Sequence, residues 1–445
     1  MARRIALAAL VLASVTSAWL LSTDDARVWP VRNTLQYHVM RWWQAATGSP
    51  GTQGLNGGAL GSIRGRVRDA QGFPLSGIHV LLTRWDGTTY GTRTGRAGDY
   101  RIDGVPAGSY ALVTGEAAGG GNAKWLRIVE QQDMRADVRL MRERHVARVA
   151  PAQNVEVGDA ERVRVDAPLP GEALRRTVRF SSGGRPSQPV LYYTPIGLTA
   201  PAPVLLAVYP GPADGWGAAS VPLAAAGYAV IAAGPAYSFE LERDVDELAR
   251  LLQLAGDGRL PGADARRTAV LGGSYSALHV QRLMQREHNA QGSDAGIGAS
   301  GSASGARSRS SSGSVALKAA VLMGAPSDLF DMRRRLENGT YVPPFGLDQA
   351  LIALGFPDRE PVRHWRYSGA YHVHSGMPPV LLVHSRQDDV VPYQQSELLA
   401  RLLSDASVPH ELRLLDGGSH YLLSNEADAR AVRDLTLTFL RRYVG

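Results

Sequence analysis

The sequence predicts an α/β protein: a larger domain with a doubly wound, mostly parallel sheet follows a small N-terminal antiparallel β-sandwich. Three observations lead to this prediction. The chain has 445 residues, more than one hydrophobic core usually organises, so two or more domains are expected. Beyond residue 61 apolar and polar residues alternate strictly, and beyond residue 176 apolar runs alternate with helical patterns. The 44% hydrophobic content excludes a mostly disordered chain.

The first 21 residues have the features of an export signal. Met1 to Arg4 carry positive charge, and Ile5 to Leu21 form an apolar run without a charge. The length of this run lies between that of a signal-peptide core and that of a membrane span. Thr16 to Ala18 suit a cleavage site, whereas Trp19 to Leu21 extend the run and favour an uncleaved anchor. We expect a protein that is exported, periplasmic or extracellular, or one that this segment anchors to the membrane.

Three further segments show no packing pattern. Residues 22–60 end in a stretch rich in Gly, Ser and Pro, which indicates a flexible linker. Residues 143–175 have no obvious period and are interpreted as a second linker. Residues 288–314 are of low complexity and too polar to pack, so we expect a disordered surface insertion there.

Residues 61–142 carry the alternation that is typical of half-buried strands. Ile63, Gly65 and Val67 fall on one face with arginines on the other, and the pattern recurs from Met134 to Leu140. The stretches GRVRDAQGFPLSGIHVLL and TGRAGDYRIDGVPAGSYALV resemble the carboxypeptidase regulatory-like domain, a transthyretin-type sandwich. Because such sandwiches serve many purposes, we expect a structural spacer here rather than a ligand-binding module.

The rest of the chain alternates buried strands with amphipathic helices. Leu241, Val245 and Leu248 repeat at helical spacing between two of the apolar runs. Uniformly apolar runs separated by helices are typical of a parallel sheet covered on both faces. The runs are PVLLAVY, GYAVIAAG, TAVLGG, LKAAVLMGAP and PPVLLVHS.

Composition excludes several kinds of function. The formal net charge is +7, but acidic residues are interspersed with the arginines and there is no basic stripe, so nucleic-acid binding is not expected. The chain contains no cysteine, which excludes disulfides, a cysteine nucleophile and thiolate metal sites.

The stretch VLGGSYSA turns an apolar strand directly into a helix and leaves Ser274 at the turn, the position of a nucleophile elbow. The strained turn needs small residues two positions to either side, which Gly272 and, less ideally, Ser276 provide. A serine hydroxyl needs a general base and a carboxylate that orients it. Asp388 and His420 follow later strands in the order serine, acid, histidine, so they are the predicted partners.

Residues 176–445 resemble the prolyl oligopeptidase and dienelactone hydrolase branches of the α/β-hydrolases. In these branches the acid lies in a His-Gly-x-x-Asp-x-x-Val-Pro pattern, which is matched here from His384 to Pro392 with Ser385 in place of glycine. In this register the acid is Asp388 rather than its neighbour Asp389. The resemblance implies the α/β-hydrolase fold and serine hydrolase activity.

Acyl transfer also needs two backbone donors for the developing oxyanion. One is the amide of Tyr275, directly after the nucleophile. The other should come from the loop at Tyr209, where relatives have His-Gly-Gly and this chain has Tyr-Pro-Gly-Pro. Since proline has no amide hydrogen, Gly211 is the donor that remains.

Four aromatic residues offer weaker signals. His372 and His374 form an H-x-H pair without a third ligand at suitable spacing, so we expect them to line a loop or lid rather than bind metal. Trp216 and Tyr237 fall where the family folds loops over the active site, and ordinary aromatic packing explains them equally well.

The sequence therefore predicts a serine hydrolase that cleaves a carboxylic ester or a short peptide and needs no cofactor. The small sandwich, in place of the large propeller of the peptidase branch, favours an esterase or a small-peptide substrate. The alternative is a catalytically inactive hydrolase fold that serves as a binding or scaffold protein of the cell envelope, to which the proline-rich loop and Ser276 point. Acyl transfer to an acceptor other than water would use the same residues.

Overall fold

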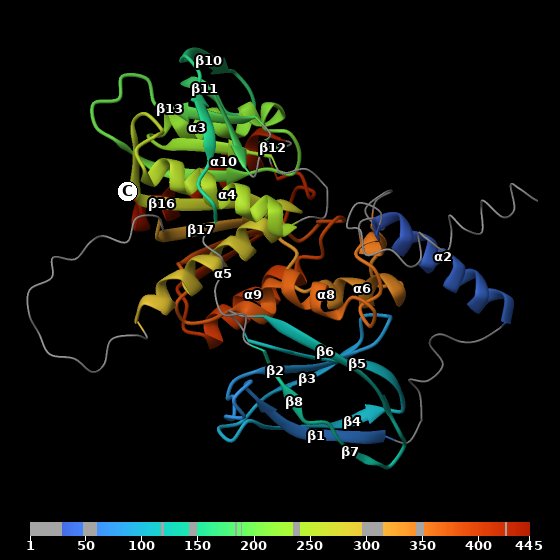
Figure 1. Cartoon of the computed structure of the whole chain (residues 1–445). Helices are drawn as coiled ribbons and strands as arrows, with labels where there is room; N and C mark the ends of the chain where they lie inside the picture. The colour runs from blue at the N-terminus through green and yellow to red at the C-terminus, as the bar shows by residue number, and fades with distance from the viewer. Residues whose placement is uncertain are drawn as a thin grey trace, which may run out of the picture. The chain divides into compact units, whose positions relative to one another are not determined.

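The computed structural model describes residues 29–47, 60–116, 120–141, 149–182, 185–187, 189–234, 241–295, 315–343, 351–422 and 425–445 (Figure 1). The export signal predicted for residues 1–21 and most of the insertion predicted for residues 288–314 lie outside these residues. Among the described helices, none is long and apolar enough to cross a membrane.

The chain divides into two compact units. The sandwich unit contains the described residues up to Glu116, those of Gly120–Arg142 and, unexpectedly, Leu329–Arg366. The hydrolase unit is made chiefly of the described residues of Glu143–Asp328 and Tyr367–Gly445. The segment 329–366, called the excursion below, thus leaves the sequence range predicted for the catalytic domain and joins the other unit.

The sandwich consists of two sheets with a shared core. Ile63 and Val67 are fully buried between exposed arginines, which confirms the predicted alternation. One sheet has the order β4-β1-β7 with β8 also on β1, and the other has the order β3-β2-β5-β6. The strands are β1 (Leu60–Arg68), β2 (His79–Thr83), β3 (Thr89–Arg93), β4 (Asp99–Pro106), β5 (Gly108–Gly115), β6 (Gly121–Ile128), β7 (Asp133–Arg135) and β8 (Val138–Arg139).

The sandwich is mainly antiparallel, as predicted, but at one edge β7 and β8 pair with β1 in parallel. The chain reaches β7 from β6 of the other sheet, and such a crossover, unlike a hairpin, allows parallel pairing.

The excursion packs against the sandwich through a buried tryptophan. Trp365 is fully buried, and a Cβ atom added to Gly115 would lie 2.2 Å from its Cζ2 atom. At Gly121 an added Cβ would lie 2.9 Å from Cε3 of the same ring. Only glycine on β5 and β6 therefore leaves room for this indole. Two described helices of the excursion are α6 (Leu329–Glu337) and α8 (Pro361–Tyr367); Tyr367, the last residue of α8, lies beyond the excursion.

An N-terminal helix, α2 (Trp29–Thr47), belongs to the same unit. The side-chain amide of Asn33 donates to the carbonyl of Ala353 at 2.9 Å, and Arg32 pairs with Glu360 at 2.9 Å. The buried Arg333 of α6 lies over the rings of Tyr37 and Phe356 and pairs with Glu337. These contacts correct the prediction that residues 22–60 are only a flexible linker.

The hydrolase unit is built on one large sheet of order β10-β11-β13-β15-β14-β16-β17-β18-β19, with β9 and β12 also on β11. In this order, neighbouring strands pair antiparallel from β10 as far as β15. All later neighbours, from the pair β15–β14 to the pair β18–β19, are parallel. The strands are β9 (Gln153–Val157), β10 (Glu161–Val165), β11 (Gly171–Ser182), β12 (Arg185–Pro186), β13 (Val190–Thr194), β14 (Ala202–Val208), β15 (Ala229–Ala233), β16 (Ala263–Gly273), β17 (Leu317–Met323), β18 (Val380–Ser385) and β19 (His410–Leu415).

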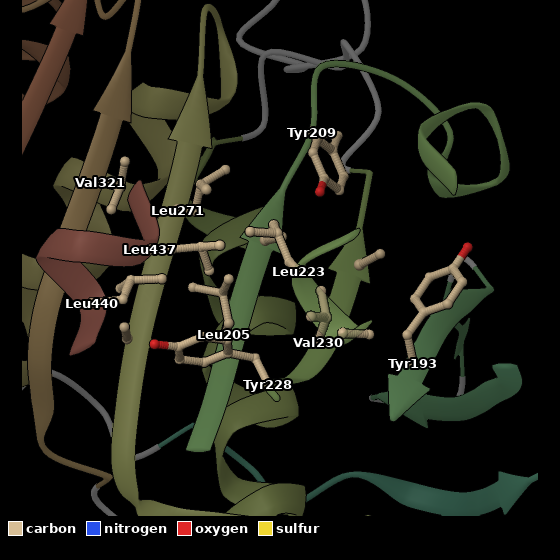
Figure 2. Packing of buried hydrophobic residues seen from close by; sticks show 14 of the residues in the cluster. Tyr193, Leu205, Tyr209, Leu223, Tyr228, Val230, Leu271, Val321, Leu437 and Leu440 are labelled. Carbon is tan, nitrogen blue, oxygen red and sulfur yellow. The ribbon is translucent and has the colours of Figure 1, made fainter. Parts of the chain in front are cut away.

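Helices cover both faces of this sheet, as the alternation of runs predicted. Figure 2 shows one face, on which α3 and α10 bury a core that includes Leu205, Leu223, Leu271, Leu437 and Leu440. The opposite face carries α4, α5 and α9. The helices are η1 (Ala213–Trp216), α3 (Gly217–Ala225), α4 (Leu241–Gly256), α5 (Ser276–Ala295), η2 (Gly369–His372), α9 (Gln394–Asp405) and α10 (Glu426–Tyr443).

Two predicted boundaries in this unit were wrong. The predicted linker 143–175 contains β9, β10 and the start of β11, and the predicted insertion begins too early because α5 continues to Ala295. The strands predicted from the apolar runs are confirmed, and the arrangement is the α/β-hydrolase fold.

Candidate active site

The turn between β16 and α5 has the strained geometry predicted for a nucleophile elbow. Ser274 has a φ of 53°, which non-glycine residues rarely adopt, and its amide donates to the carbonyl of Met323 at 2.8 Å. A Cβ atom on Gly272 would lie 2.6 Å from Cγ2 of Val280, so that position has no room for a side chain. Ser276 fits where relatives have glycine because its hydroxyl donates to the carbonyl of Gly273 at 2.9 Å.

The three residues predicted as a triad converge at the C-terminal edge of the sheet. His420 Nε2 lies 2.7 Å from Ser274 Oγ, and His420 Nδ1 lies 2.8 Å from Oδ2 of Asp388. Because the carboxylate can only accept when ionised, Nδ1 carries the proton and the unprotonated Nε2 accepts from the serine hydroxyl. The three groups therefore form one continuous relay, from hydroxyl to imidazole to carboxylate.

Asp388 is held by backbone amides as well as by this histidine. Its Oδ1 accepts from the amides of Val390 at 2.9 Å and Val391 at 2.7 Å. Burial alone would raise the pKa of Asp388, but hydrogen bonds from His384, His420 and a backbone amide hold it well below its usual range. Asp389, the alternative acid, is exposed.

A second histidine contacts the same carboxylate, a role that sequence reasoning missed. Nε2 of the fully buried His384 lies 3.1 Å from Oδ2 of Asp388 and 2.9 Å from the carbonyl of Val391. Since a carbonyl only accepts, Nε2 carries the proton, and Nδ1 accepts from the hydroxyl of Ser396 at 2.7 Å. The signal was present in the sequence as the first residue of the motif that contains the acid.

A glycine next to the triad allows the histidine and the carboxylate to approach the sheet. Gly324 follows β17 with a φ of 53°, and a Cβ atom there would lie 3.2 Å from Cε1 of His420 and 3.3 Å from Oδ2 of Asp388. A side chain at this position would be strained and would crowd the relay.

The predicted oxyanion loop follows β14 at the level of the elbow. Val208 of β14 aligns with Gly272 of β16, so the loop and Ser274 leave the sheet at the same edge. Gly211 is buried and has a φ of 111°, a conformation that glycine adopts without strain. Tyr275, the other predicted donor, directly follows the nucleophile and packs edge-on against His279, with ring centroids 5.0 Å apart.

The four aromatic residues with weaker signals lie in different surroundings. Trp216 stacks on Tyr209 with ring centroids 4.9 Å apart, and Tyr237 lies outside the described residues. His372 is fully buried in η2, so the expectation that it lines a loop or lid is wrong; His374 is half-buried. Within the described part of the chain no three His, Asp or Glu side chains are grouped to hold a metal ion.

Two protein families match parts of this chain. Residues 62–141 match the carboxypeptidase regulatory-like domain, and residues 334–445 match the prolyl oligopeptidase family. Both resemblances predicted from the sequence are therefore confirmed. No curated protein matches the chain.

Solved structures with a similar arrangement include esterases and a peptidase. A bacterial heroin esterase is 18% identical, with 65% of this chain and 85% of that chain covered and a TM-score of 0.45. An esterase from Thermogutta terrifontis is 15% identical (57% and 86% covered, TM-score 0.41). The acylaminoacyl peptidase of Pyrococcus horikoshii is 15% identical (80% and 61% covered, TM-score 0.44).

Proposed function

We propose that this protein, a serine hydrolase by its fold and its family match, cleaves carboxylic ester or peptide bonds through an acyl-enzyme formed on Ser274. The relay from Ser274 through His420 to Asp388 is the observation that supports this most directly. The buried carboxylate fixes the imidazole tautomer that the reaction needs.

In the proposed first half-reaction, Oγ of Ser274 attacks the substrate carbonyl while its proton moves to Nε2 of His420. The tetrahedral intermediate collapses when Nε2 returns that proton to the leaving alcohol or amine. Water then attacks the acyl-enzyme while Nε2 of His420 accepts its proton. The second tetrahedral intermediate releases the carboxylic acid when Nε2 returns that proton to Oγ of Ser274. Asp388 stays ionised throughout and stabilises the imidazolium.

The oxyanion of each tetrahedral intermediate would be bound by the backbone amides of Tyr275 and Gly211. Prolines on either side of Gly211 leave it as the donor of that loop, and its conformation there suits glycine. Removal of one such donor lowers kcat by about a hundredfold or more in serine hydrolases.

Labelling with a fluorophosphonate tests the nucleophile. We expect the wild-type protein to be modified at Ser274, the Ser274→Ala variant to remain unmodified, and a Ser404→Ala control on the exposed side of α9 to be labelled like wild type. A folded wild-type protein that is neither labelled nor active on any ester or peptide amide would favour the inactive scaffold instead.

The proposed cellular location is the envelope or the exterior. A cationic flank followed by an uncharged apolar run supports export or anchoring through residues 1–21. Fractionation of cells that express the full chain tests this: recovery of the protein with residues 1–21 intact in the cytosol would contradict it.

A further inference from the structure

An apolar cavity of about 210 Å³ lies in the hydrolase unit between α3 and α10. Ala218 and Ala219 of α3 face it, and larger side chains there would occupy the space. The lining also includes five larger apolar or aromatic residues: Tyr209, Trp216, Leu271, Met323 and Val432. The cavity is therefore made by small residues on one helix and large apolar residues around it.

Ser274 and His420 are not among the described residues that line this cavity, but residues that contact Ser274 or lie close to it in the sequence are. Met323 lines it, and the carbonyl of the same residue accepts the amide hydrogen of Ser274. Leu271 lies on β16 just before the elbow, and Tyr209 directly precedes the loop that carries Gly211. Residues next to the nucleophile and to the predicted oxyanion loop thus form part of the wall.

One wall is fixed in place by its own contacts. The rings of Tyr209 and Trp216 are stacked at 4.9 Å with an interplanar angle of 5°. The hydroxyl of Tyr209 accepts a hydrogen bond from Ser220 at 3.0 Å, and both residues are buried. Such a wall needs no rearrangement to receive a ligand, which favours binding.

We propose that this cavity binds the acyl chain of the substrate, and that the preferred substrates are esters of apolar carboxylic acids. This inference rests on the proposed role of Ser274, because the acyl chain extends from the carbonyl carbon bonded to its Oγ atom. Among the described residues that line the cavity, Arg433 alone is cationic, and its charge is paired with Asp434 at 2.8 Å, which favours an uncharged acyl group.

The size of the cavity sets the length of the chain. A protein cavity of about 150 Å³ holds benzene, so this one has room for about eight carbon atoms, in a linear or phenyl-bearing acyl group. Each methylene that enters should raise kcat/KM about fourfold, because burial of a methylene contributes about 0.8 kcal/mol.

Hydrolysis of a series of nitrophenyl esters by the full-length protein tests the proposal. From acetate through butyrate and hexanoate to octanoate we expect kcat/KM to rise, and with dodecanoate, which exceeds the cavity, we expect the rise to stop. Fluorophosphonate labelling of the same preparations reports separately on Ser274.

Filling the cavity should remove this preference. In Ala219→Phe, and in Ala218→Phe as a second variant, the ratio of kcat/KM for hexanoate to that for acetate should fall from about 250-fold, fourfold for each of four methylenes, to nearly one, while Ser274 is still labelled. The matched control is Ala225→Phe, on the same helix at an exposed position that does not line the cavity.

The two proposals fail in different ways. A protein that is labelled and hydrolyses acetate, but shows no rise with chain length or keeps the rise in both filled variants, overturns the assignment of the cavity alone. A folded protein without labelling or turnover overturns the role of Ser274, and the cavity assignment falls with it.

Discussion

At the scale of single residues, the carboxylate of Asp388 accepts from two backbone amides and two histidines. Only His420 belongs to the relay. His384 contacts the same oxygen atom, Oδ2, and is held as the Nε2-protonated tautomer by the carbonyl of Val391 and the hydroxyl of Ser396. We interpret His384 as a positioning residue that fixes the carboxylate in the orientation that His420 needs.

Replacement of His384 should therefore slow turnover without weakening substrate binding. We expect His384→Leu to lower kcat about tenfold to a hundredfold with KM nearly unchanged, because a hydrogen bond to a charged group contributes about 1.5–3 kcal/mol. His384→Gln keeps an N–H donor and should recover part of the loss, and Ser396→Ala should cost less than His384→Leu. Steady-state kinetics on one ester decide this; equal losses in the Leu and Gln variants would contradict it.

The residues of the relay could be predicted from the sequence because each follows a strand within a short motif. Ser274 was predicted from the strand-to-helix turn, and His420 from the rule that strand ends meet at one edge. Asp388 was separated from Asp389 by the register of the family motif. The contact of His384 depends on how residues 385–391 fold back onto it; the motif includes this histidine but does not show which atoms it contacts. The cavity beside Ser274 was equally hidden, since α10 reaches it from the end of the chain.

At the scale of elements, apolar runs predicted β14 to β18 correctly because these strands are buried on both faces. The missed strand β10 lies at the edge of the sheet with exposed charged residues, and its alternation extends over only five residues, so it was overlooked. The missed helix α2 is only weakly amphipathic and is held by Arg32 and Asn33 against residues more than three hundred positions away. Elements that depend on distant partners carry little local signal.

The excursion contains a histidine that should make its stability depend on pH. His364 is buried, its Nδ1 lies 3.0 Å from the carbonyl of Glu360, and its ring packs on Phe330. Burial lowers the pKa of His364 from 6.5 to about 3, opposed by the Glu360 carbonyl and reinforced by the nearby charges of Arg333 and Arg363. Above pH 6.5 both folded and unfolded states hold this side chain neutral, and its titration has no effect.

As the pH falls from 6.5 towards 3, the unfolded state gains a proton that the folded state does not. The free energy of unfolding should then decrease by up to about 1.4 kcal/mol per pH unit from this group. Urea unfolding at neutral and mildly acidic pH measures this, and His364→Gln should show a smaller decrease than wild type. Identical decreases in the two proteins would assign the pH dependence to other groups.

At the scale of the whole molecule, the sandwich is more than the spacer predicted from its sequence. Trp365 of the excursion fills a site between β5 and β6 that only glycines permit, and the turn at Gly87 lies against α6. The family match for residues 334–445 begins inside this excursion. The first part of the sequence that matches the prolyl oligopeptidase family therefore belongs to the sandwich unit.

Deletion of residues 60–141 should expose the indole of Trp365 and leave the excursion without its core. We expect the deleted protein to be cleaved by trypsin within residues 329–366 much faster than the full chain, since that segment contains several arginines. Mass spectrometry of the first fragments reads this out. Equal protection of the excursion in both proteins would show that the sandwich contributes nothing to its stability.

Hydrogen bonds join the chain on either side of the excursion. The amides of Ser327 and Asp328 both donate to the side chain of Gln395, at 2.9 and 2.7 Å, and Tyr371 donates to the carboxylate of Asp328 at 3.1 Å. The amide of Ala370 donates to the carbonyl of Ser327 at 3.0 Å. The residues that precede and follow the excursion are thus hydrogen-bonded to one another within the hydrolase unit.

The entropic cost of closing a loop between two such hydrogen-bonded ends grows only slowly with the number of residues inserted between them. This junction is accordingly a natural grafting point. A foreign module whose own termini lie close together could be exchanged for residues 329–366 without displacing β17 or β18, and a catalytic sheet of this kind could acquire new accessory domains by recombination at this one place.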